Sequence, residues 1–289
     1  MTFRQWVGIF FMMLCASLLG GYAQRTDNRI VTPLKIDSAY ERIMRTQTIR
    51  CGYGQWPPFI SKDVQTGKFT GIFYDYLEAL GKSLSLKIEW TEEFGTGDFG
   101  LALKSQRIDA MCGSIWANAA RAREMDFITP IYYTPIYAYV REDDKRFDDN
   151  LNSINSPSVS IVTMDGEMAG LIADSDFPRA RKTELPQLSS VSEFFINIAM
   201  KKADVTFTSP SMFALYEAHN SGKIRQIPSS RPIRVFPNTI AIPTGEYKLQ
   251  RMLDTATKEL LANGNITKIL EKYRPHTDGF LEVSTPYSK

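Results

Sequence analysis

The feature that most constrains the fold is an alternation of short apolar runs with amphipathic helical segments. Residues 48–53, 86–90 and 108–112 have the length and composition of strands. Between and around them, segments near 38–45, 73–84 and 98–105 carry apolar residues at helical spacing. This alternation predicts an α/β domain built on a mainly parallel sheet.

A second series of the same kind follows the apolar segment 132–141. Residues 159–163 and 205–208 read as strands, Ser190 and Glu193 form a capping box that opens a helix, and 247–263 is the longest predicted helix. Residues 239–242 read as a return strand. Because no linker rich in Pro, Gly or Ser separates the two series, we expect two domains packed about a cleft.

Ligands of open α/β sheets bind beyond the carboxyl ends of the strands. In this chain those ends are followed by Trp56, Arg121, Glu167 and Ser209. If the strands are assigned correctly, the four side chains surround one crevice.

Arg121 draws attention because of its place in a predicted helical turn. Asn118 is a suitable N-cap, which puts Arg121 at the third position, where a cation faces the positive end of the helix dipole and costs about 0.3–1 kcal/mol. A bound carboxylate would explain the residue, since backbone N–H groups and a guanidinium together form an anion site. The alternative is an exposed pair with Glu124, three residues on.

The net charge argues against nucleic-acid binding, and the N-terminal sequence predicts export. A net charge of +2 over 289 residues gives no basic field, so we expect no nucleic-acid partner. Arg4, the apolar run 7–19 and a small-residue site ending at Ala23 predict a signal peptide over residues 1–23 and export to the periplasm. The run is short for a membrane span of about 20 residues, although an uncleaved anchor is the alternative.

Removal of the signal peptide leaves Cys51 and Cys112. Export permits a disulfide. Both cysteines lie in predicted neighbouring parallel strands, however, where bridging geometry is poor, and this favours two buried thiols. The two histidines, His219 and His276, are far apart, and no Cys/His cluster has metal-ligand spacing, so no metal site or cofactor is expected.

Several motifs in their order along the chain resemble the family 3 periplasmic solute-binding proteins, the polar amino-acid receptors of ABC importers. Each motif is weak alone, but together they cover nearly all of the mature chain. The segments are 48–52, 56–59, 107–110, 126–132, 202–205 and 263–269.

The resemblance implies the type II periplasmic-binding-protein fold, with two lobes joined by two hinge crossings around a ligand cleft. Residues 24–138 plus 236–289 would form lobe one, and residues 139–235 lobe two. It further implies a monomer that closes on a small solute and delivers it to an ABC-transporter permease in the inner membrane, with no catalysis.

By the same resemblance, Arg121 grips a ligand carboxylate. Trp56 falls where the family places an aromatic wall, and Ser114 where a polar contact from lobe one is expected. Loss of a desolvated Arg–carboxylate pair typically costs about 2–5 kcal/mol.

Three positions depart from the family pattern. Ser209 replaces the Asp that usually holds the ligand ammonium, Gly166-Glu167-Met168 replaces a glycine-threonine-threonine turn, and Trp116 replaces a small polar residue. Either Glu167 supplies the missing negative charge, or the ligand has no α-amino group. Trp116 would either stack on the ligand and limit the length of its side chain, or fill the core. An acidic residue such as Glu167 also stabilises the first turn of a helix without any ligand.

The expected function is therefore a periplasmic receptor for a small carboxylate-bearing solute, an amino acid or a related organic acid. One alternative is a lyase of the cyclohexadienyl (prephenate or arogenate) dehydratase type, which is similar in fold and would use Glu167 as its acid. The other is a ligand-sensing accessory protein.

Overall fold

The computed structural model describes residues 37–95, 99–186, 189–273 and 279–283. The predicted signal peptide lies outside the described residues. Ser38–Lys289 form one compact unit, to which the helices and strands below belong. None of the helices within the described ranges is both long and apolar enough to cross a membrane.

The helices and strands follow the predicted alternation. The helices are α2 (Ala39–Thr46), α3 (Ile72–Leu84), α4 (Phe99–Lys104), α5 (Met168–Asp176), α6 (Val191–Ala199), α7 (Pro210–Asn220), α8 (Tyr247–Ala262) and α9 (Asn265–Lys272), with short 3-10 turns at Arg121–Arg123 and Leu151–Ile154. The strands are β1 (Thr48–Tyr53), β2 (Ser61–Lys62), β3 (Phe69–Thr70), β4 (Lys87–Glu93), β5 (Ala110–Trp116), β6 (Met125–Phe127), β7 (Tyr132–Arg141), β8 (Ser160–Met164), β9 (Arg181–Leu185), β10 (Val205–Thr208), β11 (Ile224–Gln226), β12 (Arg234–Pro243) and β13 (Leu281–Glu282).

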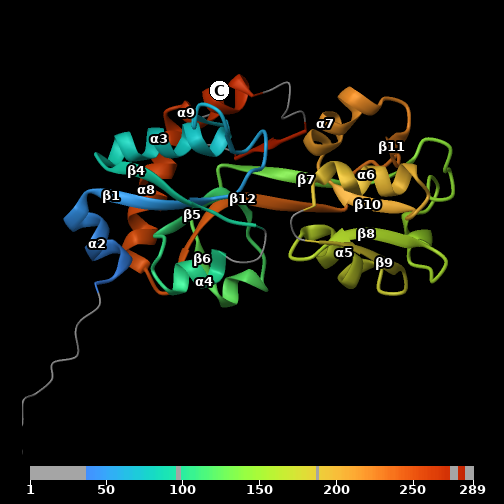
Figure 1. The fold of residues 1–289 in the computed structure, drawn as a ribbon, viewed down its shortest axis with the longest axis horizontal. Coiled ribbons are helices and arrows are strands. Elements are labelled where there is room, and N and C mark those ends of the chain that lie inside the picture. Colours follow the sequence, from blue (N-terminus) through green and yellow to red (C-terminus); the bar gives the residue numbers. More distant parts are fainter. Residues whose placement is uncertain (1–36, 96–98, 187–188, 274–278, 284–289) are drawn as a thin grey trace, which may run out of the picture. The chain divides into compact units, whose positions relative to one another are not determined.

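The main sheet has the strand order β4-β1-β5-β12-β7-β10-β8-β9. Strand β1 runs parallel to β4 and β5, and β8 runs parallel to β9 and β10, as the alternation predicts. Strands β7 and β12 are antiparallel to each other and connect these two parallel groups (Figure 1). Helices α2, α3, α8 and α9 lie with the first group, and α5, α6 and α7 with the second. The predicted lobe boundaries stay a prediction.

Strand β5 differs from its predicted extent. The sequence predicted a strand over residues 108–112, but β5 continues to Trp116 because β12 pairs alongside it, with Asn238 opposite Trp116 and Thr239 opposite Ile115. A tertiary partner thus extends the strand past a glycine that would locally favour a turn. The consequence is that Ser114 and Trp116 sit on a sheet strand rather than on a loop.

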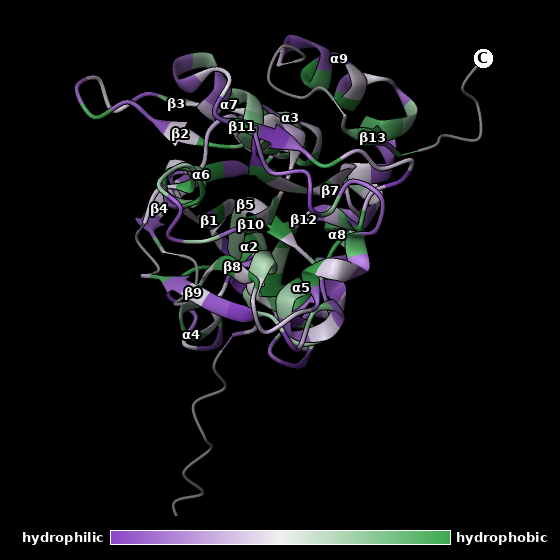
Figure 2. Ribbon diagram, turned by 90° about the vertical axis from the view of Figure 1, so that its right-hand side faces the viewer, coloured by the Kyte–Doolittle hydropathy of each residue, from purple (hydrophilic) through white to green (hydrophobic). Residues whose placement is uncertain are grey.

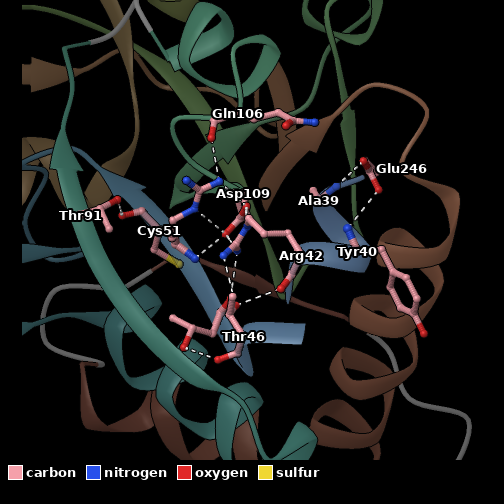
Figure 3. A network of polar contacts seen from close by, with 12 residues as sticks. Ala39, Tyr40, Arg42, Thr46, Cys51, Thr91, Gln106, Asp109 and Glu246 are labelled. Carbon is pink, nitrogen blue, oxygen red and sulfur yellow. Dashed lines mark hydrogen bonds and ion pairs between the residues drawn. The ribbon is translucent and has the colours of Figure 1, made fainter. Parts of the chain in front are cut away.

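In both strand groups, an aspartate just before one strand exchanges two hydrogen bonds with the backbone of the neighbouring strand. Asp109, just before β5, accepts a hydrogen bond from the backbone N–H of Arg50 in β1 (2.7 Å), and its own N–H donates to the Arg50 carbonyl. Asp204, just before β10, makes the same two contacts with Ser160 of β8, at 2.9 and 2.8 Å. Figure 3 shows the Asp109 network, in which Arg42 also donates to the carboxylate. These contacts tie the start of β5 to β1 and the start of β10 to β8.

Burial distinguishes central from edge strands. All five residues of β8 are buried, whereas β9, at the sheet edge, is exposed or half-buried throughout. Figure 2 shows β9 in the purple of hydrophilic residues. Separate apolar clusters support the two groups: one contains Phe73, Leu77 and Leu253, and another contains Ile161 and Phe207.

The expectation of two free thiols is wrong, because Cys51 and Cys112 form a disulfide. Strand register explains the difference. Cys51 lies opposite Ala110, so Cys112, two positions further along β5, points to the same face of the sheet. The two Cα atoms are 5.3 Å apart, inside the range that a disulfide spans.

Candidate ligand-binding site

A pocket of about 90 Å³ lies at the carboxyl ends of the parallel strands, where the sequence predicted a crevice. Segments that follow β1, β4 and β8 contribute to its wall, together with β5, the end of β10 and helices α4, α5, α6 and α7. Its lining residues are Gly54, Trp56, Phe59, Phe94, Gly95, Phe99, Met111, Ser114, Ile115, Trp116, Arg121, Gly166, Glu167, Met168, Val191, Phe194, Thr208 and Met212. Six of the seven predicted site residues are among them.

Arg121 reaches from the first strand group to the second. Its Nη1 donates to the Trp116 carbonyl (3.1 Å) and its Nη2 to the Gly166 carbonyl (3.0 Å). Its backbone N–H donates to Asn118 Oδ1 (3.0 Å), which is the contact expected of a cap, but the 3-10 turn begins at Arg121 itself and has Ala120 as its N-cap. Burial lowers the pKa of the guanidinium, and the nearby Glu167 carboxylate partly offsets this.

The surroundings of Arg121 leave donors for a ligand. The guanidinium lies 5.8 Å from the centre of the Phe99 ring, and its hydrogen bonds go to backbone carbonyls rather than to Glu124, the alternative partner. Two of its five N–H groups are used by the carbonyls of Trp116 and Gly166. The remaining N–H groups and the positive charge are suited to an anion.

Gly166 and Glu167 form the turn that faces Arg121 from the end of β8. Gly166 has a φ of 76°, a left-handed conformation that glycine adopts without strain, and its carbonyl accepts from Arg121. Glu167 is the N-cap of α5, and its Oε2 accepts from the Ala169 N–H at 2.8 Å. Burial raises the pKa of Glu167, and hydrogen bonding and Arg121 partly counter that rise.

Ser114 and Trp116 share a partner that sequence reasoning missed. Ser114 Oγ (2.5 Å) and Trp116 Nε1 (2.8 Å) both donate to Oδ1 of Asn238 in β12. The Trp116 ring also stacks on Phe236, with centroids 5.1 Å apart and planes within 6°. Trp116 therefore both lines the pocket and packs against the core, the two alternatives considered for it.

Trp56 lines the pocket, whereas Ser209 does not. Trp56 is half-buried, and it packs against apolar clusters of both strand groups while lining the pocket. Ser209 is fully buried, but it is the residue of the predicted set that does not line the pocket. Its hydroxyl caps α7 by accepting from the Met212 N–H and lies 2.9 Å from Ser211 Oγ. Its neighbour Thr208 reaches the pocket instead.

The apolar part of the lining was not predicted. Phe94, Phe99, Met111, Met168 and Met212 come from five different segments. Apolar residues in these segments are predicted from the sequence to lie in the core. Nothing in the local sequence distinguishes a side chain that lines a pocket from one that packs in the core. Within the described ranges, no group of three or more His, Cys, Asp or Glu side chains is arranged to hold a metal ion.

A mixed α/β fold with two strand groups, two antiparallel connecting strands and a pocket at the strand ends defines a protein that encloses a small solute. The model of the bacterial extracellular solute-binding proteins, family 3, matches residues 49–276. The chain belongs to this family, and it is a solute-binding protein rather than an enzyme.

Among curated proteins, the L-arginine-binding protein of Pseudomonas aeruginosa is 25% identical over 230 residues, which cover 75% of this chain and 84% of the relative. Two solved structures share the fold. The cysteine-binding protein from Campylobacter jejuni has a TM-score of 0.71 at 15% identity, covering 86% of this chain and 100% of that one. The ancestral amino acid-binding protein AncCDT-1, a precursor of cyclohexadienyl dehydratase, has a TM-score of 0.70 at 22% identity, covering 82% and 99%. These likenesses confirm the type II periplasmic-binding-protein fold.

Proposed function

We propose that the protein captures a small carboxylate-bearing solute in this pocket and delivers it to an ABC importer. The observation that carries the proposal is the position of Arg121. A partly buried guanidinium lines the pocket, keeps unused donors, and bridges backbone carbonyls of residues 116 and 166. A carboxylate accepts two parallel hydrogen bonds from such a group, and in a desolvated pocket this pair is strong.

The similarity to receptors for L-arginine and L-cysteine supports an amino acid or a related organic acid as the solute. Trp56, Ser114, Trp116, Gly166 and Glu167 complete the proposed binding surface. Ser209 acts through the helix cap of α7 and not by contact with the ligand.

The proposed cellular setting follows from the family and the N-terminal sequence. We propose that residues 1–23 are a cleaved signal peptide, that the mature monomer works in the periplasm, and that its partner is a permease of the inner membrane. Residues 24–138 plus 236–289 would then form lobe one and residues 139–235 lobe two, with β7 and β12 as the hinge crossings.

Binding is tested by a thermal-shift screen of the purified mature chain against amino acids, dicarboxylates and keto acids. A ligand at a hundred times its Kd stabilises the native state by about 2.7 kcal/mol, which is easily seen as a rise in Tm. Each hit is then titrated calorimetrically against wild type and Arg121→Ala, with Arg123→Ala as control. Arg123 is an exposed neighbour outside the pocket lining.

The proposal predicts that Arg121→Ala loses about thirtyfold or more in affinity for every carboxylate hit, while Arg123→Ala binds like wild type. Hits that bind equally well to Arg121→Ala would show that the guanidinium does not hold the ligand, and the proposed function would then lose its basis.

A further inference from the structure

The charges in the pocket are balanced. Among the described lining residues, Arg121 and Glu167 carry charge, one positive and one negative. The Arg121 guanidinium reaches the turn that carries Glu167, because its Nη2 donates to the carbonyl of the adjacent Gly166 at 3.0 Å. When both groups are ionised, the described lining of the pocket has no net charge.

A neutral pocket discriminates between ligands by their total charge. A simple monocarboxylate on Arg121 would leave the Glu167 carboxylate without a counter-charge in a partly desolvated site. An amino acid with a cationic side chain would bring one positive charge too many. Uncompensated charge of either sign is costly to bury. A zwitterion brings one charge of each sign, and each can face its opposite.

Glu167 has the capacity to receive an ammonium group. An ionised carboxylate offers about four acceptor positions, and the helix cap with Ala169 uses one of them. The Ser209 hydroxyl, at the position where an acidic group would otherwise be sought, is committed to Met212 and Ser211. Glu167 is thus the anionic partner that the described lining offers to an ammonium.

The rest of the wall suits an apolar side chain. Trp56, Phe59, Phe94, Met111 and Phe194 line the pocket together with further aromatic and methionine side chains. Two polar groups of the lining are engaged elsewhere, because the Ser114 hydroxyl and the Trp116 indole both donate to Asn238. A polar or charged ligand side chain would lose its hydration among mostly apolar side chains and would gain few partners.

We infer that the ligand is a zwitterionic α-amino acid with a compact, uncharged and apolar side chain, whose carboxylate binds Arg121 and whose ammonium binds Glu167. This inference rests on the proposed function, because it takes the Arg121–carboxylate contact as given. It adds the partner of the amino group and the class of the side chain.

The test is a calorimetric titration of the purified mature chain with a matched set of probes. L-Leucine, L-methionine and L-phenylalanine represent the inferred class. L-Arginine and L-glutamate carry a charged side chain, and 4-methylpentanoate is L-leucine without its amino group. We expect at least one of the three apolar amino acids to bind ten times more tightly than each of the other probes.

The variant Glu167→Gln separates the two charges. Its amide oxygen can still accept from the Ala169 N–H, so the cap of α5 is retained, and circular dichroism with a thermal scan verifies the fold. We expect the bound apolar amino acid to lose at least tenfold in affinity, whereas 4-methylpentanoate should bind more tightly because the opposing carboxylate is gone.

Three results would overturn the inference: tighter binding of L-arginine or L-glutamate than of all three apolar amino acids, no loss of their affinity in Glu167→Gln, or no binding of any of the three. If 4-methylpentanoate then binds wild type and fails to bind Arg121→Ala, the proposed carboxylate receptor survives and only the inference falls. If no carboxylate in the wider screen depends on Arg121, both fall.

Discussion

The buried carboxylate of Asp109 should dominate the stability of the strand group around β1. Its side chain is 1% exposed, and it accepts from Arg42 Nε (2.8 Å), Arg50 Nη2 (3.0 Å) and the Arg50 backbone N–H (2.7 Å) (Figure 3). The side chains of Arg42 and Arg50 are themselves only 18% and 27% exposed. Replacing Asp109 therefore leaves two partly buried cations without their counter-charge.

The expected magnitude follows from this geometry. Breaking a buried ion pair by removing one partner costs about 3–5 kcal/mol. Asp109→Asn retains one acceptor oxygen, so we expect the low end, about 3 kcal/mol. For a chain of this size, 1 kcal/mol corresponds to a Tm change of about 2–4 °C, which gives a fall of roughly 6–12 °C.

Denaturant unfolding of wild type and Asp109→Asn measures the difference, read as a shift in midpoint at an unchanged slope. Glu92→Gln is the matched control, because Glu92 and Arg107 form an ion pair whose side chains are 38% and 51% exposed. Exposed pairs contribute about 0–1 kcal/mol. If Asp109→Asn cost no more than Glu92→Gln, the structural role assigned to Asp109 would be refuted.

Three further predictions concern the disulfide, the pocket carboxylate and the aromatic wall. The Cys51→Ala/Cys112→Ala double variant should lose about 4 kcal/mol in urea unfolding, the loop-entropy value for a separation of 61 residues, and an unchanged midpoint would contradict it. Because burial raises the pKa of Glu167 from its ordinary 4.5, the native state binds this proton more tightly than the unfolded state, so stability should fall as pH rises from 4.5 through the raised pKa. The pH profile of Glu167→Gln should be flatter there, and coinciding profiles would argue against a buried carboxyl. Ligand binding should change tryptophan emission, and Trp56→Phe should reduce this change more than Trp90→Phe, which replaces a residue outside the pocket lining; equal reductions would place the ligand away from Trp56.

Local patterns predicted the central elements well. Strands β1 and β10 have the predicted bounds, and the capping box at Ser190 is present, because short apolar runs and cap residues act through contacts near in sequence. Strand β9 was missed: its Arg181–Leu185 sequence is polar, and pairing with β8 makes it a strand. The full length of β12 likewise depends on its partners β5, β6 and β7.

In the candidate site, too, local features were predictable and features that depend on strand pairing were not. The contact between the Arg121 N–H and Asn118 could be anticipated from helix-capping preferences. The rule that ligands bind at the carboxyl ends of strands correctly predicted that Trp56, Arg121 and Glu167 line one pocket. The link from Ser114 to Asn238 spans 124 residues and depends on strand order, which no local pattern encodes. Strand register, equally hidden in a single sequence, decided the pairing of the two cysteines.

The most direct test of the account is a crystal structure of the mature chain with a bound ligand from the screen. The quantity to measure is the distance from the Arg121 guanidinium nitrogens to the ligand carboxylate oxygens. The account predicts two contacts of about 2.7–2.9 Å, as in charge-assisted Arg–carboxylate pairs, inside the pocket lined by Trp56 and Glu167. A carboxylate held by other groups, with the Arg121 side chain directed to bulk water, would contradict it.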